Sequence, residues 1–77
     1  MKVVIAKVDQ VFYDGEAASL IAPGSDGQLT ILTHHMPLVT TLKEGELVVK
    51  EKEGSEHRFP LKEGVLEVHH NGATVIL

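Results

Sequence analysis

Hydrophobic residues in this 77-residue chain come in short runs rather than in long blocks. Valine, isoleucine, leucine and threonine dominate the runs, and glycine, proline, aspartate or asparagine separates one run from the next. Runs of this kind are typical of β-strands, and no segment keeps a helical period over the roughly twelve residues that a stable helix needs. The pattern therefore predicts nine short strands and almost no helix: Lys2–Val8, Val11–Tyr13, Ala17–Ala22, Gln28–Leu32, Leu38–Leu42, Glu46–Lys52, His57–Leu61, Val65–His69 and Ala73–Leu77.

Alternation within the runs indicates which face of each strand is buried. Between residues 47 and 52, Leu47 and Val49 fall on one face, whereas Val48, Lys50 and Lys52 fall on the other. A single open sheet of this length would expose too much apolar surface, so the buried faces of two sheets must pack together. We therefore expect an all-β fold, a two-sheet β-sandwich of about nine to ten short strands that occupies residues 1–77 as one domain.

Glycine-containing dipeptides predict the turns between these strands. Asp14-Gly15 and Asn71-Gly72 suit two-residue type I′ hairpin loops, because glycine adopts a positive φ at no steric cost. Ser25-Asp26-Gly27 and Glu53-Gly54-Ser55 predict two further turns. The pattern Leu-Lys-Glu-Gly-x-Leu occurs twice, and two copies indicate one turn type used twice rather than a repeat architecture. These copies are Leu42–Leu47 and Leu61–Leu66.

Composition and charge exclude several classes of protein. Hydrophobic residues make up 43% and charged residues 23%, which is globular composition, and the absence of cysteine excludes disulfides. The net charge is −4 and the lysines and arginine are scattered, so we expect no nucleic-acid partner. No apolar stretch approaches the roughly 20 residues of a membrane helix. We expect a soluble intracellular chain that reaches a membrane only through a protein partner.

Histidine is unusually frequent, with five in the chain, and imidazole is a common metal ligand. Four of them form the adjacent pairs His34-His35 and His69-His70. Neighbours on a strand point to opposite faces, so neither pair places two imidazoles on one ion easily. A site built from one member of each pair and a carboxylate such as Glu67 stays open as an alternative, although we assign no metal ligands.

Catalytic motifs are absent from the sequence. The three serines lack a Gly-x-Ser-x-Gly setting, and there is no cysteine nucleophile. The loop Pro23–Gly27 lacks the Gly-Lys-Ser/Thr ending of a nucleotide-binding loop, and Asp26 would repel a phosphate. We therefore expect no enzyme activity, no catalytic residue and no cofactor.

The segment from Pro23 to Val39 is the most distinctive part of the sequence. It combines a glycine turn, a short apolar strand and a His-x-Pro step formed by His35, Met36 and Pro37. In order and spacing it resembles the central motif of the N-terminal β-sandwich domain in the epsilon chain of F-type ATP synthase. The resemblance covers the whole chain and includes Tyr13–Glu16, Leu42, Gly45, Phe59-x-Leu61, Gly64–Val68, Asn71 and Thr74–Leu77.

Three features depart from the pattern of that family. His34 stands where the family commonly has glycine, so the turn before His35 is expected to change. Glu63 stands where the family usually has the first of two glycines, which predicts a different backbone conformation there. The family continues into a C-terminal helical hairpin that carries inhibition of ATP hydrolysis and, in some members, ATP binding. Because the sequence stops at Leu77, we expect no such hairpin and assign neither activity.

The resemblance implies a non-catalytic subunit of the ATP synthase rotor. In this family the β-sandwich docks on the gamma subunit and on the c-ring, and it couples ion flow to ATP synthesis at the cytoplasmic face of the bacterial inner membrane. By position in the motif, Ser25, Asp26 and Gln28 would lie at the c-ring end, and His35 and Met36 would lie near the rotor interface. Two alternatives stay open: a stand-alone β-sandwich that binds a metal through its histidines, and a diverged module that binds a different protein.

Overall fold

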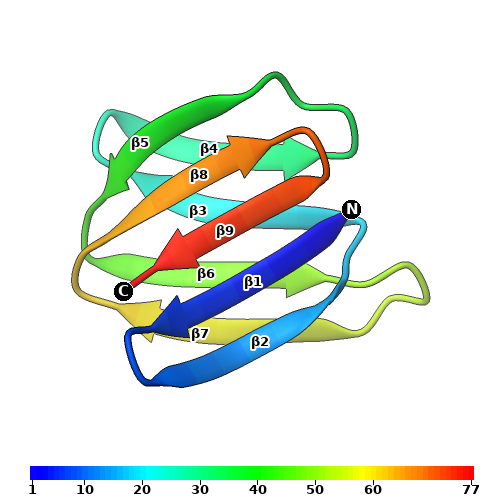
Figure 1. The fold of residues 1–77 in the computed structure, drawn as a ribbon, viewed down its shortest axis with the longest axis horizontal. Helices are drawn as coiled ribbons and strands as arrows, with labels where there is room; N and C mark the ends of the chain where they lie inside the picture. Colours follow the sequence, from blue (N-terminus) through cyan, green and yellow to red (C-terminus); the bar gives the residue numbers. More distant parts are fainter.

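The computed structural model describes residues 1–77 and contains nine strands and no helix, as the hydrophobic pattern predicts (Figure 1). Strand ends differ from the predicted bounds by a few residues, most of all in the second strand. Since there is no helix, no helix is long enough to cross a membrane. The strands are β1 (Lys2–Lys7), β2 (Gln10–Glu16), β3 (Ser19–Gly24), β4 (Gly27–Leu32), β5 (Leu38–Leu42), β6 (Gly45–Lys50), β7 (Glu56–Leu61), β8 (Gly64–His69) and β9 (Gly72–Ile76).

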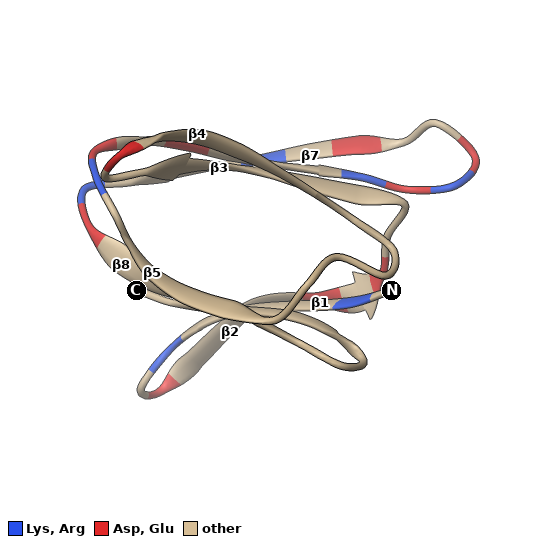
Figure 2. Cartoon of the chain, turned by 90° about the horizontal axis from the view of Figure 1, so that it is seen from above, with Lys and Arg blue, Asp and Glu red and all other residues tan.

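The strands form two layers that face each other, which Figure 2 shows from above. One layer has the order β2-β1-β9-β8-β5, and the other contains β4, β3, β6 and β7. All neighbours are antiparallel except β1 and β9, which run parallel. Backbone pairing joins the two layers only at one point, where Gly24 of β3 pairs with Leu42 of β5. The predicted β-sandwich is therefore confirmed, and it is a single sheet curled over on itself.

Apolar side chains from both layers fill the space between them. The alternation predicted for the sixth strand holds for Leu47 and Val49, which are fully buried in the core. On the opposite face Lys50 is exposed as predicted, but Val48 is buried, where it pairs with Ile21 and Arg58 in the sheet. No buried polar side chain lacks a hydrogen-bond partner. The core consists of Val3, Ile5, Ala17, Leu20, Ala22, Ile31, Leu42, Leu47, Val49, Leu61, Leu66, Val68, Ala73 and Val75.

The prediction of a hairpin loop at Asp14-Gly15 is wrong. Both residues lie inside β2, where Asp14 pairs with Val4 and Gly15 pairs with Val3, and the turn into β2 lies at residues 8–9 instead. Gly15 does not have a positive φ. A Cβ at this position would lie 3.2 Å from the hydroxyl oxygen of Tyr13. Glycine therefore makes room for an aromatic side chain two residues away on the same face of the strand, rather than for a turn.

The hairpin predicted at Asn71-Gly72 is present, but its loop is shifted by one residue. His70 and Asn71 form the loop, and Gly72 opens β9 with a φ of +154°. A Cβ on Gly72 would overlap the backbone carbonyl of Lys2, the residue with which Gly72 pairs in β1. The predicted turns at Ser25-Asp26-Gly27 and Glu53-Gly54-Ser55 are both present, with a positive φ at each glycine.

The two copies of Leu-Lys-Glu-Gly-x-Leu make the same kind of connection. Residues 43–44 lead from β5 to β6, and residues 62–63 lead from β7 to β8, so each copy carries the chain from one layer to the other. The leucines at both ends of each copy are buried in the core. Glu63 does not have a positive φ. The repeat is therefore one crossover solution used twice.

Candidate docking surfaces

Ser25 ties the β3–β4 turn to β5. Its backbone N–H donates to the carbonyl oxygen of Thr41 at 3.0 Å, and its Oγ lies 2.7 Å from Thr41 Oγ1 and 3.2 Å from Thr41 O. The hydroxyl of Ser25 is therefore already engaged inside the chain. Its contribution to a docking surface would be to hold the turn in place rather than to present a free hydroxyl.

Asp26 and Gln28 are exposed and have no side-chain hydrogen bond or ion pair in the structure. Gly24 and Gly27, on either side of Ser25-Asp26, fix the turn that leads into Gln28. Gly27 has a φ of +135°, and a Cβ on Gly24 would lie 2.6 Å from the carbonyl oxygen of Gly27. Close backbone packing thus presents one free carboxylate and one free amide at this end of the sandwich.

His34 is the only non-glycine residue with a positive φ, at +72°. The residue before His35 therefore has the left-handed conformation that glycine adopts easily. That the turn differs from that of the family stays a prediction. Histidine pays a steric penalty in this region because its Cβ approaches a backbone carbonyl oxygen. This left-handed residue sets the direction in which the chain enters the segment that follows.

His35 and Met36 occupy the connection between β4 and β5. The backbone N–H of His35 donates to Leu32 O at 3.1 Å, and His35 Nδ1 lies 2.8 Å from Met36 O. Because a carbonyl oxygen only accepts, the proton of the neutral ring is on Nδ1 and Nε2 keeps its lone pair. His35 is half-buried, whereas the Met36 side chain is 78% exposed. A partner would meet an apolar thioether beside an acceptor nitrogen.

The five predicted interface residues do not gather in one place. Ser25, Asp26 and Gln28 lie at one end of the strands, whereas His35 and Met36 lie at the opposite end (Figure 1). β4 runs between the two ends and connects them. The structure thus divides the five candidates between two separate places.

Four of the five histidines line one pocket of about 200 Å³ between the β4–β5 connection and the β8–β9 loop. These are His34, His35, His69 and His70, and His69 Nε2 lies 3.2 Å from Thr74 Oγ1. Glu67, the suggested carboxylate ligand, does not line this pocket. No group of three or more histidine, aspartate or glutamate side chains is placed to hold a metal ion. The geometry thus gives no support to the metal alternative.

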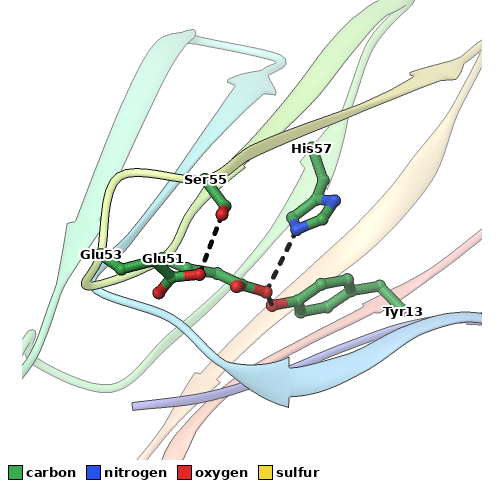
Figure 3. Close-up of polar contacts among 5 residues, drawn as sticks. All are labelled: Tyr13, Glu51, Glu53, Ser55 and His57. Carbon is green, nitrogen blue, oxygen red and sulfur yellow. Dashed lines mark hydrogen bonds and ion pairs between the residues drawn. The ribbon is translucent and has the colours of Figure 1, made fainter.

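Sequence reasoning missed a polar cluster across the open side of the sandwich (Figure 3). Tyr13 in β2 donates its hydroxyl to Glu51 Oε2 at 2.6 Å, and His57 Nε2 lies 3.1 Å from the same oxygen. The Tyr13 ring also packs against His57 and Phe59, with ring centroids 5.4 and 6.0 Å apart. We call Tyr13, Glu51, His57 and Phe59 the open-edge cluster. It joins β2 to β7, two strands that share no backbone ladder.

The surroundings of Tyr13 change its acidity. Burial, followed by the hydrogen bond to the Glu51 carboxylate and by nearby negative charges, raises the pKa of Tyr13 to about 12. In the loop between β6 and β7, which also carries Glu51, hydrogen bonds from the backbone and from Ser55 lower the pKa of Glu53. Only the order of the strands reveals this cluster, because its members are far apart in the sequence.

The sequence model of the ATP synthase delta/epsilon chain β-sandwich domain matches residues 1–77, the full extent of the chain. The chain belongs to this family. Its relatives include the ATP synthase epsilon chain of Clostridium kluyveri, 37% identical over 99% of this chain and 58% of that protein. The epsilon chain of Alkalilimnicola ehrlichii is 36% identical over 99% of this chain and 54% of that protein. The chain thus spans a little over half the length of these relatives.

Solved structures share the fold of this family member at low sequence identity. A chain of the Euglena gracilis mitochondrial ATP synthase superimposes with a TM-score of 0.88 at 18% identity, over 96% of this chain and 48% of that one. A chain from the central stalk and c-ring of Tetrahymena thermophila mitochondrial ATP synthase gives 0.79 at 16% identity, over 97% and 60%. At such identities the likeness concerns the β-sandwich fold alone.

Proposed function

We propose that residues 1–77 act as one domain of an ATP synthase epsilon chain, a non-catalytic part of the central stalk that docks on the gamma subunit and on the c-ring. The observation that carries this proposal is the family match over the whole chain together with the family's fold. The bacterial epsilon chains among its relatives support a place at the cytoplasmic face of the inner membrane, reached through the complex.

The two ends of the sandwich suit two different contacts. Asp26 and Gln28 offer a free carboxylate and a free amide for the polar surface of the c-ring, while His35 and Met36 offer a mixed polar and apolar surface for gamma. Between these ends lies a tightly packed apolar core, and packed interiors deform little. A rigid body with a contact at each end transmits torque between gamma and the ring without performing chemistry of its own.

The deciding experiment mixes this chain with the gamma subunit from the same source and measures binding by calorimetry and analytical ultracentrifugation. We expect a one-to-one complex that is weakened by His35→Ala and left intact by the matched control His57→Ala at the opposite margin. Failure to bind a folded gamma subunit would contradict the proposal and favour a diverged binding module. A saturable rise in Tm with zinc or nickel would instead support the metal alternative.

The contact with the c-ring has its own test. Incorporation of Asp26→Lys into the complete ATP synthase is expected to weaken coupling between ion pumping and ATP hydrolysis, because the substitution reverses the charge of an exposed turn. The control Lys62→Glu reverses a charge in a neighbouring crossover at the same end and is expected to have a smaller effect. Equal losses from both variants would mean that the Asp26 turn makes no specific contact.

A further inference from the structure

Three strands, β2, β7 and β4, have a neighbour on one side only, and the edges of β2 and β7, on one side of the molecule, are well protected against pairing. β2 carries a bulge opposite Ile5 and Ala6, together with the charges of Asp14 and Glu16. β7 contains Pro60, which lacks a backbone N–H, and its exposed Arg58 forms ion pairs. Bulges, charges and prolines are the features by which natural sheets prevent an added strand. The open-edge cluster further covers the gap between these two strands.

The edge of β4 on the opposite side of the molecule has unpaired backbone groups. The carbonyl oxygen of Pro23 accepts a hydrogen bond from the backbone N–H of Lys43 at 2.9 Å. The Pro23 carbonyl therefore points to the side of β3 that is away from β4. Since Gln28 is opposite Pro23, its own N–H and C=O point away from β3, and the two-residue period gives Thr30 the same orientation. β4 pairs only with β3, and no other backbone bond reaches Gln28 or Thr30.

The β4 edge also lacks every protective feature that β2 and β7 have. Its residues Gln28–Leu32 include no charge and no proline, and its pairing with β3 is regular over the whole strand. Exposed apolar side chains lie at the end of β4 and in the segment that follows it: Leu32 is 56%, Met36 78% and Val39, in β5, 70% exposed. A pocket of about 230 Å³, lined in part by Leu29 and Leu38, lies between β4 and β5.

We propose that β4 accepts an extended segment of the gamma subunit as an additional antiparallel or parallel strand; this inference rests on the proposed docking to gamma. Unpaired N–H and C=O groups in a row are satisfied by another extended backbone and not by a helix or a flat side-chain surface. The position of the edge supports gamma as the occupant. β4 leads directly into His35 and Met36, the residues assigned to the gamma contact. A gamma segment paired with β4 would therefore extend that same contact along the strand.

The geometry also predicts the sequence of the incoming segment. Side chains of Leu29 and Ile31 point toward the core, and those of Gln28 and Thr30 are exposed, so the added strand has one inner and one outer face. Its inner residues would enter the pocket beside Leu29 and Leu38, and its outer residues would remain in water. We therefore expect about five residues that alternate between apolar and polar.

Amide hydrogen exchange measured by NMR tests the proposal on the unmodified chain. In the free chain, the amides of Gln28 and Thr30 should exchange rapidly, whereas those of Leu29 and Ile31, which face β3, should be protected. In the complex with gamma, the exchange of Gln28 and Thr30 should slow by at least about tenfold. A complex that leaves these two amides unprotected would overturn the inference while leaving the docking proposal standing. No complex at all would overturn the docking proposal itself.

A proline substitution gives an independent test. Thr30→Pro removes an N–H that has no partner in the free chain, so we expect the fold to tolerate it and the affinity for gamma to fall by about tenfold or more. The control Thr30→Val keeps the N–H and should bind normally. Equal affinity of both folded variants would overturn the inference, as would a homodimer of the chain alone with protected Gln28 and Thr30 amides. If Thr30→Pro does not fold, the exchange experiment decides.

Discussion

At the scale of single residues, the backbone of His34 carries a stability cost that substitution can remove. To hold a residue other than glycine in the left-handed conformation, as His34 is held, costs about 1–2 kcal/mol. Glycine avoids this cost but loses more conformational entropy on folding, so the net gain from glycine is smaller. We expect His34→Gly to raise the free energy of unfolding by about 0.5–1 kcal/mol in denaturant titrations. His35→Gly, at a residue with negative φ, should lower it. A loss of stability in His34→Gly would mean that the imidazole makes a compensating contact.

Gly72 and Gly54 both have positive φ angles, but only Gly72 is closely packed. A Cβ on Gly54 meets nothing within 4 Å, whereas one on Gly72 would overlap the carbonyl of Lys2. We expect Gly72→Ala to lower the free energy of unfolding by more than about 3 kcal/mol, because strand β1 must move, and Gly54→Ala to lower it by about 1 kcal/mol. Thermal unfolding of the two variants provides the comparison. Similar losses of stability in the two variants would show that the positive φ alone, and not close packing, makes glycine necessary at these positions.

At the scale of elements, the open-edge cluster holds β2 against β7 through side chains alone. Tyr13→Phe keeps the ring but removes the hydrogen bond to Glu51, and we expect a loss of about 1–2 kcal/mol because the acceptor is charged. Glu51→Gln should have a similar effect. The control is Glu53→Gln, which removes a carboxylate from the same loop that bonds to Ser55 and not to Tyr13. Equal losses from both glutamate variants would indicate a general charge effect.

Tyr13 is the only tyrosine in the chain, so its ionisation can be followed directly by ultraviolet absorbance. The folded pKa is raised from 10.0 to about 12, mainly by burial and then by Glu51. The neutral phenol therefore stabilises the fold fully below pH 10, and this contribution decreases above pH 10 and is lost as pH passes 12. We expect a titration midpoint near 12, and a lower midpoint, still above 10, in Glu51→Gln. A wild-type midpoint at 10 would contradict the buried hydrogen bond.

At the scale of the whole molecule, local patterns predicted the strands, and the order of the strands could not be predicted from them. All nine strands follow from hydrophobic runs and turn residues, which are local properties. The sequence of Asp14-Gly15 suits a turn, but pairing with β1 and contact with Tyr13 decide its conformation. The candidate docking residues came from the resemblance to the family. The free edge of β4 and the open-edge cluster depend on which strands are neighbours, and no local signal encodes that.

The two layers share one core, and this predicts cooperative unfolding. Leu20 and Leu47 lie in one layer and Leu66 in the other, and all three are fully buried in the same cluster. Neither layer can keep its buried face covered after the other unfolds, so all probes should report one transition. We expect Leu66→Ala to lower the free energy of unfolding by about 2–5 kcal/mol without changing the dependence on denaturant.

Tyr13 fluorescence and far-ultraviolet circular dichroism provide the two probes for this prediction. Tyr13 reports on the open side of the sandwich, whereas circular dichroism reports on all strands. Coincident transitions in wild type and in Leu66→Ala would establish the shared core as the unit of stability. If the fluorescence changes at lower denaturant, β2 and β7 separate before the core unfolds, because only the open-edge cluster joins them. The continuous side, where Gly24 pairs with Leu42, would then act as the hinge of that opening.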